Sequence, residues 1–169
     1  MKINLFDSLS AHTPSLVGWR TFSNFFKPEK IEWIDDPLYE YDGVTVFTDK
    51  HILSPVVEQV SSKYKVAWIY ECRAIHPEVY EYVHLVQHKF DYIFTFDETL
   101  LKRGKPYTKN LYGTTRIKDC DAQIYPKNKN LCLIASQKKY AQGHKIRHAI
   151  ADTIGNRYEI DLYDRDWET

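Results

Sequence analysis

Features that mark several protein classes are scarce in this sequence. Its 23 basic and 23 acidic side chains cancel among 169 residues, so nothing indicates a chain that binds nucleic acid by bulk charge. The cysteines are few and odd in number, and no two of them have CxxC spacing. This argues against a disulfide framework or a structural zinc site and favours a reducing compartment.

Long hydrophobic runs are also missing. No segment approaches the roughly 20 apolar residues that a membrane-spanning helix needs. The N-terminal stretch MKINLFDSLS is interrupted by Asp7 too early for a signal peptide. We therefore expect a soluble, cytoplasmic protein without a transmembrane segment.

The residues that are present favour an α/β fold. Hydrophobic residues make up 43% of the chain, enough for one domain or for one domain and part of another. Short apolar runs alternate with helical patterns, which is typical of a parallel sheet covered by helices. The expected strands lie at 2–6, 30–34, 43–50, 64–70 and 90–97, and the expected helices at 18–27, 54–62, 77 onward and 98–103.

A polar stretch at 119–130 interrupts this pattern, and a second series then begins. LCLIAS predicts a buried strand, GHKIRHAIADTI a helix and YEIDLYD another strand. Two strands and one helix are too few for a separate core of useful size. We expect 1–126 to form a Rossmann-like domain, and 127–169 to be a linker and the opening strand–helix–strand of an incomplete second Rossmann-like unit.

Glu71 directly follows the apolar run 66–70, which is typical of a strand buried on both faces. Ligands of open parallel sheets bind beyond the C-terminal ends of the strands, and a carboxylate beside an apolar wall can act as a general base. Pattern alone still favours a solvated loop residue. Asp49 and Asp97 hold comparable strand-end positions, and Asp97 is better explained as a helix cap.

A second candidate site lies in IASQKKYAQGHKIRHAI. Its expected strand ends at Ser136, Lys138 and Lys139 follow in a loop, and Lys145 and Arg147 lie in the first turns of the helix. A helix start with nearby cations can bind an anion, and arginine matches phosphate oxygens. One glycine is too few for a Walker loop or a GxGxxG motif. A basic, solvated helix start explains the spacing equally well.

Two histidine pairs have the i,i+4 spacing that could bind a metal: His84 with His88, and His144 with His148. No third ligand is convincingly placed near either pair. We therefore interpret these as surface histidines and expect no metal site.

The ordered series WIYECRAI, FDYIFTFDE and CLIASQKKYAQGHKIRHAI resembles the fucosyltransferase-type glycosyltransferases of family ten, over roughly 65–164. That family has two Rossmann-like domains in the GT-B arrangement. The first holds the acceptor and the base, and the second holds the nucleotide sugar, usually a GDP-sugar. The resemblance implies that this chain comprises the first domain and the beginning of the donor domain. Gln137 departs from the family pattern, in which asparagine follows the serine.

By this resemblance, Glu71 is the catalytic base of an inverting sugar transfer and Arg147 contacts the donor diphosphate. Ser136 and Lys138 lie in the loop facing that diphosphate. No cofactor or metal is required, because Arg147 and the helix start would stabilise the departing nucleoside diphosphate. The partners would be a GDP-sugar donor and a glycan acceptor. The 169-residue chain alone is expected to be a partial, inactive enzyme.

Two other function classes remain. One is a non-catalytic carbohydrate- or protein-binding module derived from such an enzyme, which would lack turnover with any nucleotide sugar. The other is a flavodoxin-type nucleotide-binding domain, which needs a phosphate-binding loop after the first strand. DSLSAHTPS has hydroxyls there but no glycine before Gly18, which makes this the weakest alternative. The sequence carries no signal of the transferred sugar, the acceptor or the oligomeric state.

Overall fold

A computed structural model of the chain describes residues 1–7, 31–34, 37–110, 122–128, 131–154, 158 and 161–163. The chain divides into two compact units, Met1–Lys118 and Asp119–Thr169. Each unit is described by itself below. The helix expected over 18–27 lies outside the described residues, as do 119–121 and 129–130 of the expected polar stretch 119–130.

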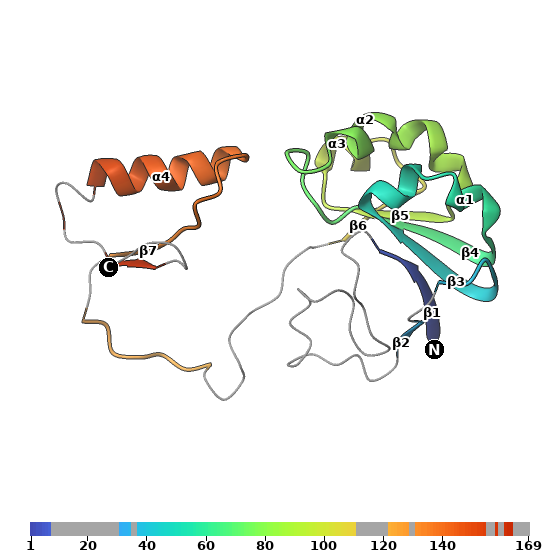
Figure 1. The fold of residues 1–169 in the computed structure, drawn as a ribbon, viewed down its shortest axis with the longest axis horizontal. Helices are drawn as coiled ribbons and strands as arrows, with labels where there is room; N and C mark the ends of the chain where they lie inside the picture. Colours follow the sequence, from blue (N-terminus) through green and yellow to red (C-terminus); the bar gives the residue numbers. More distant parts are fainter. Residues whose placement is uncertain are drawn as a thin grey trace. The chain divides into compact units, whose positions relative to one another are not determined.

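The first unit is built on a six-stranded sheet in the order β2-β1-β3-β4-β5-β6 (Figure 1). Every neighbouring pair of strands in it is parallel. This confirms the α/β class and the parallel sheet that the sequence predicts. The strands are β1 (Lys2–Phe6), β2 (Glu32–Ile34), β3 (Glu40–Thr48), β4 (Ser61–Trp68), β5 (Tyr92–Thr95) and β6 (Tyr107–Lys109).

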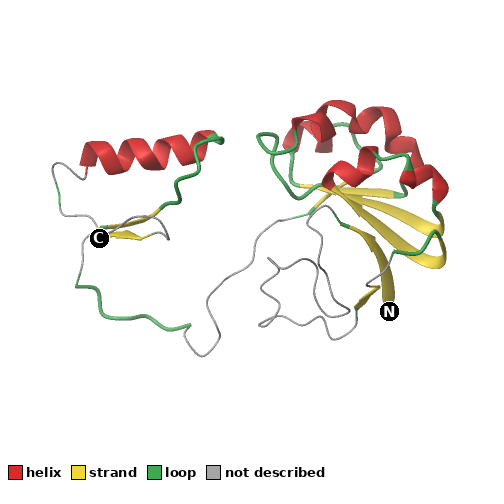
Figure 2. Ribbon diagram, in the orientation of Figure 1, coloured by secondary structure: helices red, strands yellow, loops and turns green. Residues whose placement is uncertain are grey.

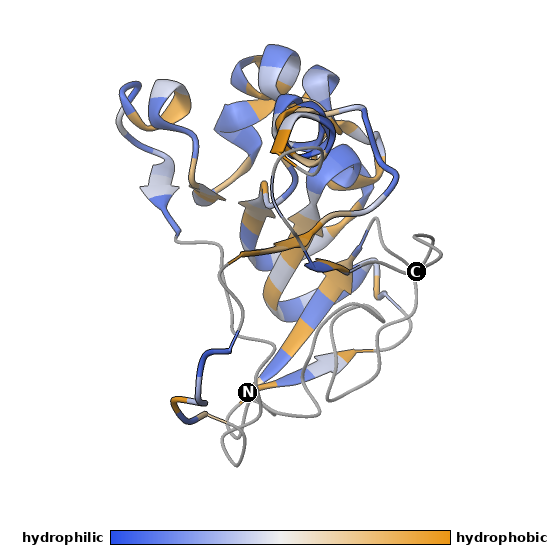
Figure 3. Ribbon diagram, turned by 90° about the vertical axis from the view of Figure 1, so that its left-hand side faces the viewer, coloured by the Kyte–Doolittle hydropathy of each residue, from blue (hydrophilic) through white to orange (hydrophobic). Residues whose placement is uncertain are grey.

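The described helices of this unit gather on one face of the sheet (Figure 2). Helix α2 begins at Pro77, as expected, and buries Val79, Tyr80 and Val83. The apolar side chains of the strands and helices form the main core between these two layers. Figure 3 shows hydrophobic and hydrophilic segments interspersed along both the strands and the helices. The helices are η1 (Asp49–Leu53), α1 (Val56–Gln59), α2 (Pro77–Val86), η2 (Gln87–Lys89) and α3 (Glu98–Leu101).

A smaller apolar cluster lies on the opposite face of the sheet. Ile3, Leu5, Val46 and Val66 are buried there. Together with aromatic neighbours, some of these residues line a hollow of about 340 Å³. Both faces of the central strands are therefore apolar, as the unbroken run 66–70 predicts. The hollow is lined by Ile3, Trp33, Val44, Val46, Val66, Trp68, Phe94 and Asn110.

Two expected elements differ from the structure. The helix predicted over 54–62 is limited to Val56–Gln59, because strand pairing takes over at Ser61. The N–H of Ser61 donates to the carbonyl of Tyr39 at 2.7 Å, and Ser61 is in register with Glu40 of β3. Strand β6 was not expected at all, because its three residues carry too little apolar pattern to be recognised.

The second unit contains β7 (Cys132–Ile134), α4 (Gln142–Ile154) and β8 (Asp161–Tyr163). The two strands are parallel neighbours, so the expected strand–helix–strand order is observed. The expected burial of the first strand is wrong, because Ile134 is 74% exposed. One helix against two strands cannot cover both faces of this small sheet.

Within the described ranges, no helix combines the length and the apolar character that crossing a bilayer requires.

Candidate functional site

The candidate site lies where the central parallel strands end. Strands β1, β3, β4 and β5 run in the same direction as adjacent members of one sheet, so their C-terminal ends meet at one edge. An acidic residue follows each of these strands closely: Asp7, Asp49, Glu71 and Asp97.

Asp7 connects the ends of three strands. Its Oδ1 accepts hydrogen bonds from Thr48 Oγ1 at 2.8 Å and from the Tyr70 hydroxyl at 3.2 Å. Its backbone oxygen lies 3.1 Å from Nε2 of His51. Burial and the charge of Asp7 raise the pKa of Tyr70, so its hydroxyl stays protonated and able to donate. Asp7 therefore makes this edge of the sheet a connected polar network rather than a row of separate loop residues.

Asp49 is the most deeply buried acid of the edge, with no exposed surface. Its Oδ1 accepts two backbone hydrogen bonds, from the N–H groups of Tyr70 and Glu71, each at 3.2 Å. Its Oδ2 is also buried and has no hydrogen-bond partner within the described part of the chain. The backbone of Asp49 has a φ of 39°, in the left-handed region that residues other than glycine rarely adopt.

This environment changes the acidity of Asp49. Burial is the largest influence and raises the pKa of its carboxyl to about 6, although the hydrogen bonds from Glu71 and Tyr70 oppose the rise. The positive charge of His76 also lowers the pKa, whereas the negative charge of Glu71 raises it. Asp49 therefore gains and loses its proton within the range of pH in which many enzymes work.

Glu71 lies just beyond β4, at the edge where the sequence analysis expects it. Its backbone is held on both sides, because its N–H donates to Asp49 and its carbonyl accepts the hydroxyl of Tyr80. The residue is partly exposed. No described residue donates a hydrogen bond to its carboxylate. The structure thus gives Glu71 a fixed backbone and a carboxylate that is not engaged elsewhere among the described residues.

Asp97 has a different role. Its Oδ1 accepts the N–H of Leu100 at 2.9 Å, which caps helix α3 as the sequence predicts. Both of its carboxylate oxygens bind Arg73, each at 2.9 Å, and the Arg73 guanidinium lies 4.6 Å from the centre of the Tyr80 ring. Burial pushes the pKa of Asp97 upward, but the bonds from Arg73 and Leu100 hold it below its usual range.

In the second unit, the structure places basic groups around the start of α4. Nε2 of His148 lies 3.0 Å from the carbonyl oxygen of Ser136, which connects the end of β7 to the helix. Burial lowers the pKa of His144, and the positive charges of Arg147 and Lys138 lower it further. Two of the expected anion-binding cations therefore act on the same imidazole. Nε of Arg147 is buried without a hydrogen-bond partner in the described ranges.

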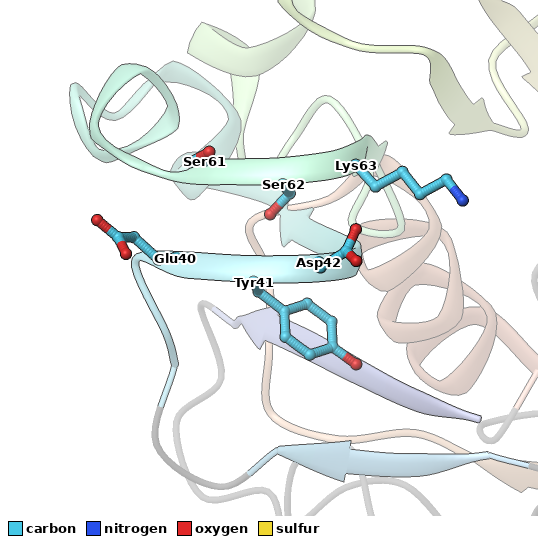
Figure 4. Close-up of a pocket in the computed structure, with 6 residues that line it drawn as sticks. All are labelled: Glu40, Tyr41, Asp42, Ser61, Ser62 and Lys63. Carbon is cyan, nitrogen blue, oxygen red and sulfur yellow. The ribbon is translucent and has the colours of Figure 1, made fainter.

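A separate hollow of about 620 Å³ lies at the opposite edge of the main sheet, where β3 and β4 begin (Figure 4). Its Tyr41 hydroxyl already donates to the carbonyl of Lys2 at 2.8 Å. The Tyr41 ring lies so close to Gly43 that a Cβ at that position would come within 2.5 Å of it. The hollow is wide but is not at the ligand-binding edge of a parallel sheet. It is lined by Glu40, Tyr41, Asp42, Ser61, Ser62 and Lys63.

Two contributors to the candidate site, Asp7 and Tyr70, were not predicted from the sequence. Asp7 directly follows an apolar strand, so the rule that singled out Glu71 would also have found it. Tyr70 was counted as part of the apolar run, and its hydroxyl gave no separate signal. Within the described ranges, no three histidine, cysteine or acidic side chains are grouped as a metal site would require.

Comparisons with models of protein families, with curated proteins and with solved structures give no match to this chain.

Proposed function

We propose that the chain is part of an inverting glycosyltransferase of the fucosyltransferase type, which moves a sugar from a GDP-sugar to a hydroxyl of a glycan. The observation that carries this proposal is the position of Glu71. It lies at the carboxyl edge of a parallel sheet, its N–H and carbonyl are both held, and no described residue occupies its carboxylate. The order of the three sequence motifs then favours sugar transfer over other chemistry that uses a carboxylate base.

In this mechanism Glu71 acts as the general base. Its carboxylate takes the proton of an acceptor hydroxyl while the hydroxyl oxygen attacks the anomeric carbon of the donor. The bond from that carbon to the diphosphate oxygen breaks on the opposite side, and the nucleoside diphosphate leaves with the electron pair. The configuration at the anomeric carbon is inverted, and no covalent intermediate with the protein forms.

The second unit would bind the departing diphosphate through Ser136, Lys138 and Arg147. Lys138 and Arg147 already act together on the His144 ring, which supports one shared basic region. Helix α4 has 13 residues, and the N–H groups of its first turn add a positive field. These groups would stabilise the negative charge of the leaving group without a metal ion.

Binding of GDP at low salt tests the donor site. We expect Arg147→Ala to weaken binding at least about tenfold, because a charged hydrogen bond contributes roughly 1.5–3 kcal/mol. Lys127→Ala is the control, since Lys127 is an exposed cation of the same unit outside α4 and the loop before it and should change the affinity little. Calorimetric titration of the parent and both variants gives the comparison. Equal affinity in the parent and Arg147→Ala would remove Arg147 from the donor site.

Turnover tests the base. Glu71→Gln keeps the size of the side chain and its backbone bonds but cannot accept the proton. Because the 169-residue chain alone is expected to be inactive, the test needs an intact enzyme with a complete donor domain. In that enzyme we expect Glu71→Gln to lower sugar transfer from a GDP-sugar by ~10²–10⁴-fold, the usual range for loss of a general base. GDP affinity should stay at the parent value, because Glu71 is not assigned to the diphosphate. Unchanged transfer by this variant would refute the assignment of the base.

A further inference from the structure

Asp49 combines three properties that a solvated loop residue does not have. Its side chain is fully buried, its backbone adopts a left-handed conformation at φ 39°, and one of its carboxylate oxygens has no hydrogen-bond partner among the described residues. A strained backbone at the end of a strand often accompanies a functional constraint. The other carboxylate oxygen accepts hydrogen bonds from the backbone of Tyr70 and Glu71, just beyond the end of β4.

We propose that Asp49 is the positioning residue of Glu71: its buried carboxyl holds the consecutive backbone N–H groups of Tyr70 and Glu71 and so fixes where the glutamate leaves β4. Both N–H groups meet one oxygen, at 3.2 Å each. Two bonds to adjacent residues restrain the orientation of the peptide between them, which a single bond would not do. Tyr80 completes the restraint through its hydrogen bond to the carbonyl of Glu71.

The arrangement also couples the charges of the two carboxyls. The titratable groups that act on Asp49 are Glu71 and His76, and Asp49 in turn acts on the hydroxyls of Tyr70 and Tyr80. When Asp49 loses its proton, its two hydrogen bonds become charge-assisted and shorter. The negative charge of Asp49 then acts on Glu71, as that of Glu71 acts on Asp49. The protonation of Asp49 therefore changes both the placement and the electrostatic surroundings of the proposed base.

A role for Asp49 in sugar transfer rests on the proposed function, whereas its hold on Glu71 does not. The test is therefore a measurement that needs no activity. The backbone amide shifts of Tyr70 and Glu71 are followed by NMR between pH 4 and 8. In the parent we expect both amides to titrate with a midpoint near pH 6, the value about which Asp49 ionises.

Three variants separate Asp49 from its neighbours. Asp49→Asn keeps the shape and an accepting oxygen, and it should abolish the titration of both amides near pH 6. Glu71→Gln should keep that titration but move its midpoint to lower pH, because the charge of Glu71 raises the pKa of Asp49. Asp91→Asn is the matched control. The Asp91 carboxyl accepts the N–H of Lys65 at 2.8 Å. Asp91 directly precedes β5, far along the sheet from the edge that carries Asp49, so this change should leave the midpoint of the titration unchanged.

Direct observation of the Asp49 carboxyl carbon in the unmutated protein gives the same midpoint without any substitution, so the test does not depend on the folding of a variant. Amides of Tyr70 and Glu71 that do not titrate near pH 6, or that titrate equally in Asp49→Asn, would overturn the proposal. Failure of the proposed function would instead be seen as absence of GDP binding. It would leave these titrations unchanged.

Discussion

Asp49 and Asp97 are residues of the same type whose pKa values are shifted in opposite directions. Both follow strands at the same edge of the sheet. Asp97 binds the guanidinium of Arg73, which holds the pKa of Asp97 down against the effect of burial. Among the described residues, Asp49 has two backbone donors and no bound guanidinium, and the charge of His76 lowers its pKa too little to offset burial, so the pKa rises. Partial burial with a full positive charge nearby stabilises the anion, whereas complete burial with neutral donors does not.

Because the pKa of Asp49 is raised, the free energy of unfolding should depend on pH. The pKa of this carboxyl changes from 3.8 to about 6 on folding, so its contribution to stability is fully present below pH 3.8 and is lost as the pH rises through about 6. Asp49→Asn removes this loss. Relative to the parent, the variant should become more stable as the pH rises from 4 to 7, by up to about 3 kcal/mol. Urea unfolding of both proteins across that range measures the difference.

Urea unfolding of the two proteins can also contradict this prediction. A stability difference between Asp49→Asn and the parent that does not change with pH would show that Asp49 keeps an ordinary pKa in the folded protein. Asp91→Asn serves again as the control. The Asp91 carboxyl lies in an exposed hydrogen bond, so the difference in stability between this variant and the parent should not follow the pH dependence expected for Asp49→Asn.

The positions of the acidic residues at the sheet edge could be predicted from the sequence, but the role of each could not. Glu71, Asp49 and Asp97 were all recognisable as polar residues at the ends of apolar strands. What separates them is the partner of each, and these partners are distant in sequence: Asp97 binds Arg73 and Asp49 binds the end of β4. Such contacts depend on how the strands are placed side by side, which no local pattern contains.

At the scale of elements, Asp97 joins the start of α3 to the loop after β4. Asp97→Ala removes the cap of α3 and the partner of Arg73 together. A lost cap typically costs about 1 kcal/mol. The ion pair adds at most a similar amount, because Arg73 is about half exposed. We expect a total loss of about 1–2 kcal/mol in the free energy of unfolding.

Asp97→Asn separates these two contributions. Asparagine is as good a cap as aspartate but lacks the charge, so this variant should lose only the part that depends on Arg73. That part should shrink at high salt, as an exposed ion pair does. If Asp97→Ala and Asp97→Asn were equally destabilised, the cap would contribute nothing and the interaction with Arg73 would explain the whole effect.

The elements themselves were predictable where their pattern was long or had clear ends. Helix α2 has Pro77 at its start and a buried valine stripe, and Gly104, with φ 75°, follows α3 at the place the sequence indicates. The boundary between α1 and β4 was not predictable. Ser61 and Ser62 favour neither a helix nor a strand, and their pairing with β3 decides the outcome. The helix expected over 18–27 stays a prediction.

At the scale of the whole molecule, the two units differ most in what they bury. The first has apolar clusters on both faces of its sheet. In the described part of the second, the buried apolar residues are Ala135 and Ala151, while Ile146 is 51% and Ile134 74% exposed. Burial of apolar area is the main favourable contribution to folding. The second unit is therefore expected to open locally far more often than the first.

Hydrogen exchange can measure this difference and connect it to the proposed function. Amides of α4 should exchange through local opening, much faster than those of β3 and β4, which exchange only when the first unit unfolds. If GDP binds at the start of α4, it stabilises the closed form of the second unit. At a GDP concentration about ten times its Kd, exchange in α4 should slow roughly tenfold, and exchange in β3 and β4 should not change.

Arg147→Ala should remove this effect without accelerating exchange in the absence of GDP. If GDP slowed exchange in the first unit but not in α4, the nucleotide would bind in the first unit. That result would contradict the assignment of Ser136, Lys138 and Arg147 to the donor.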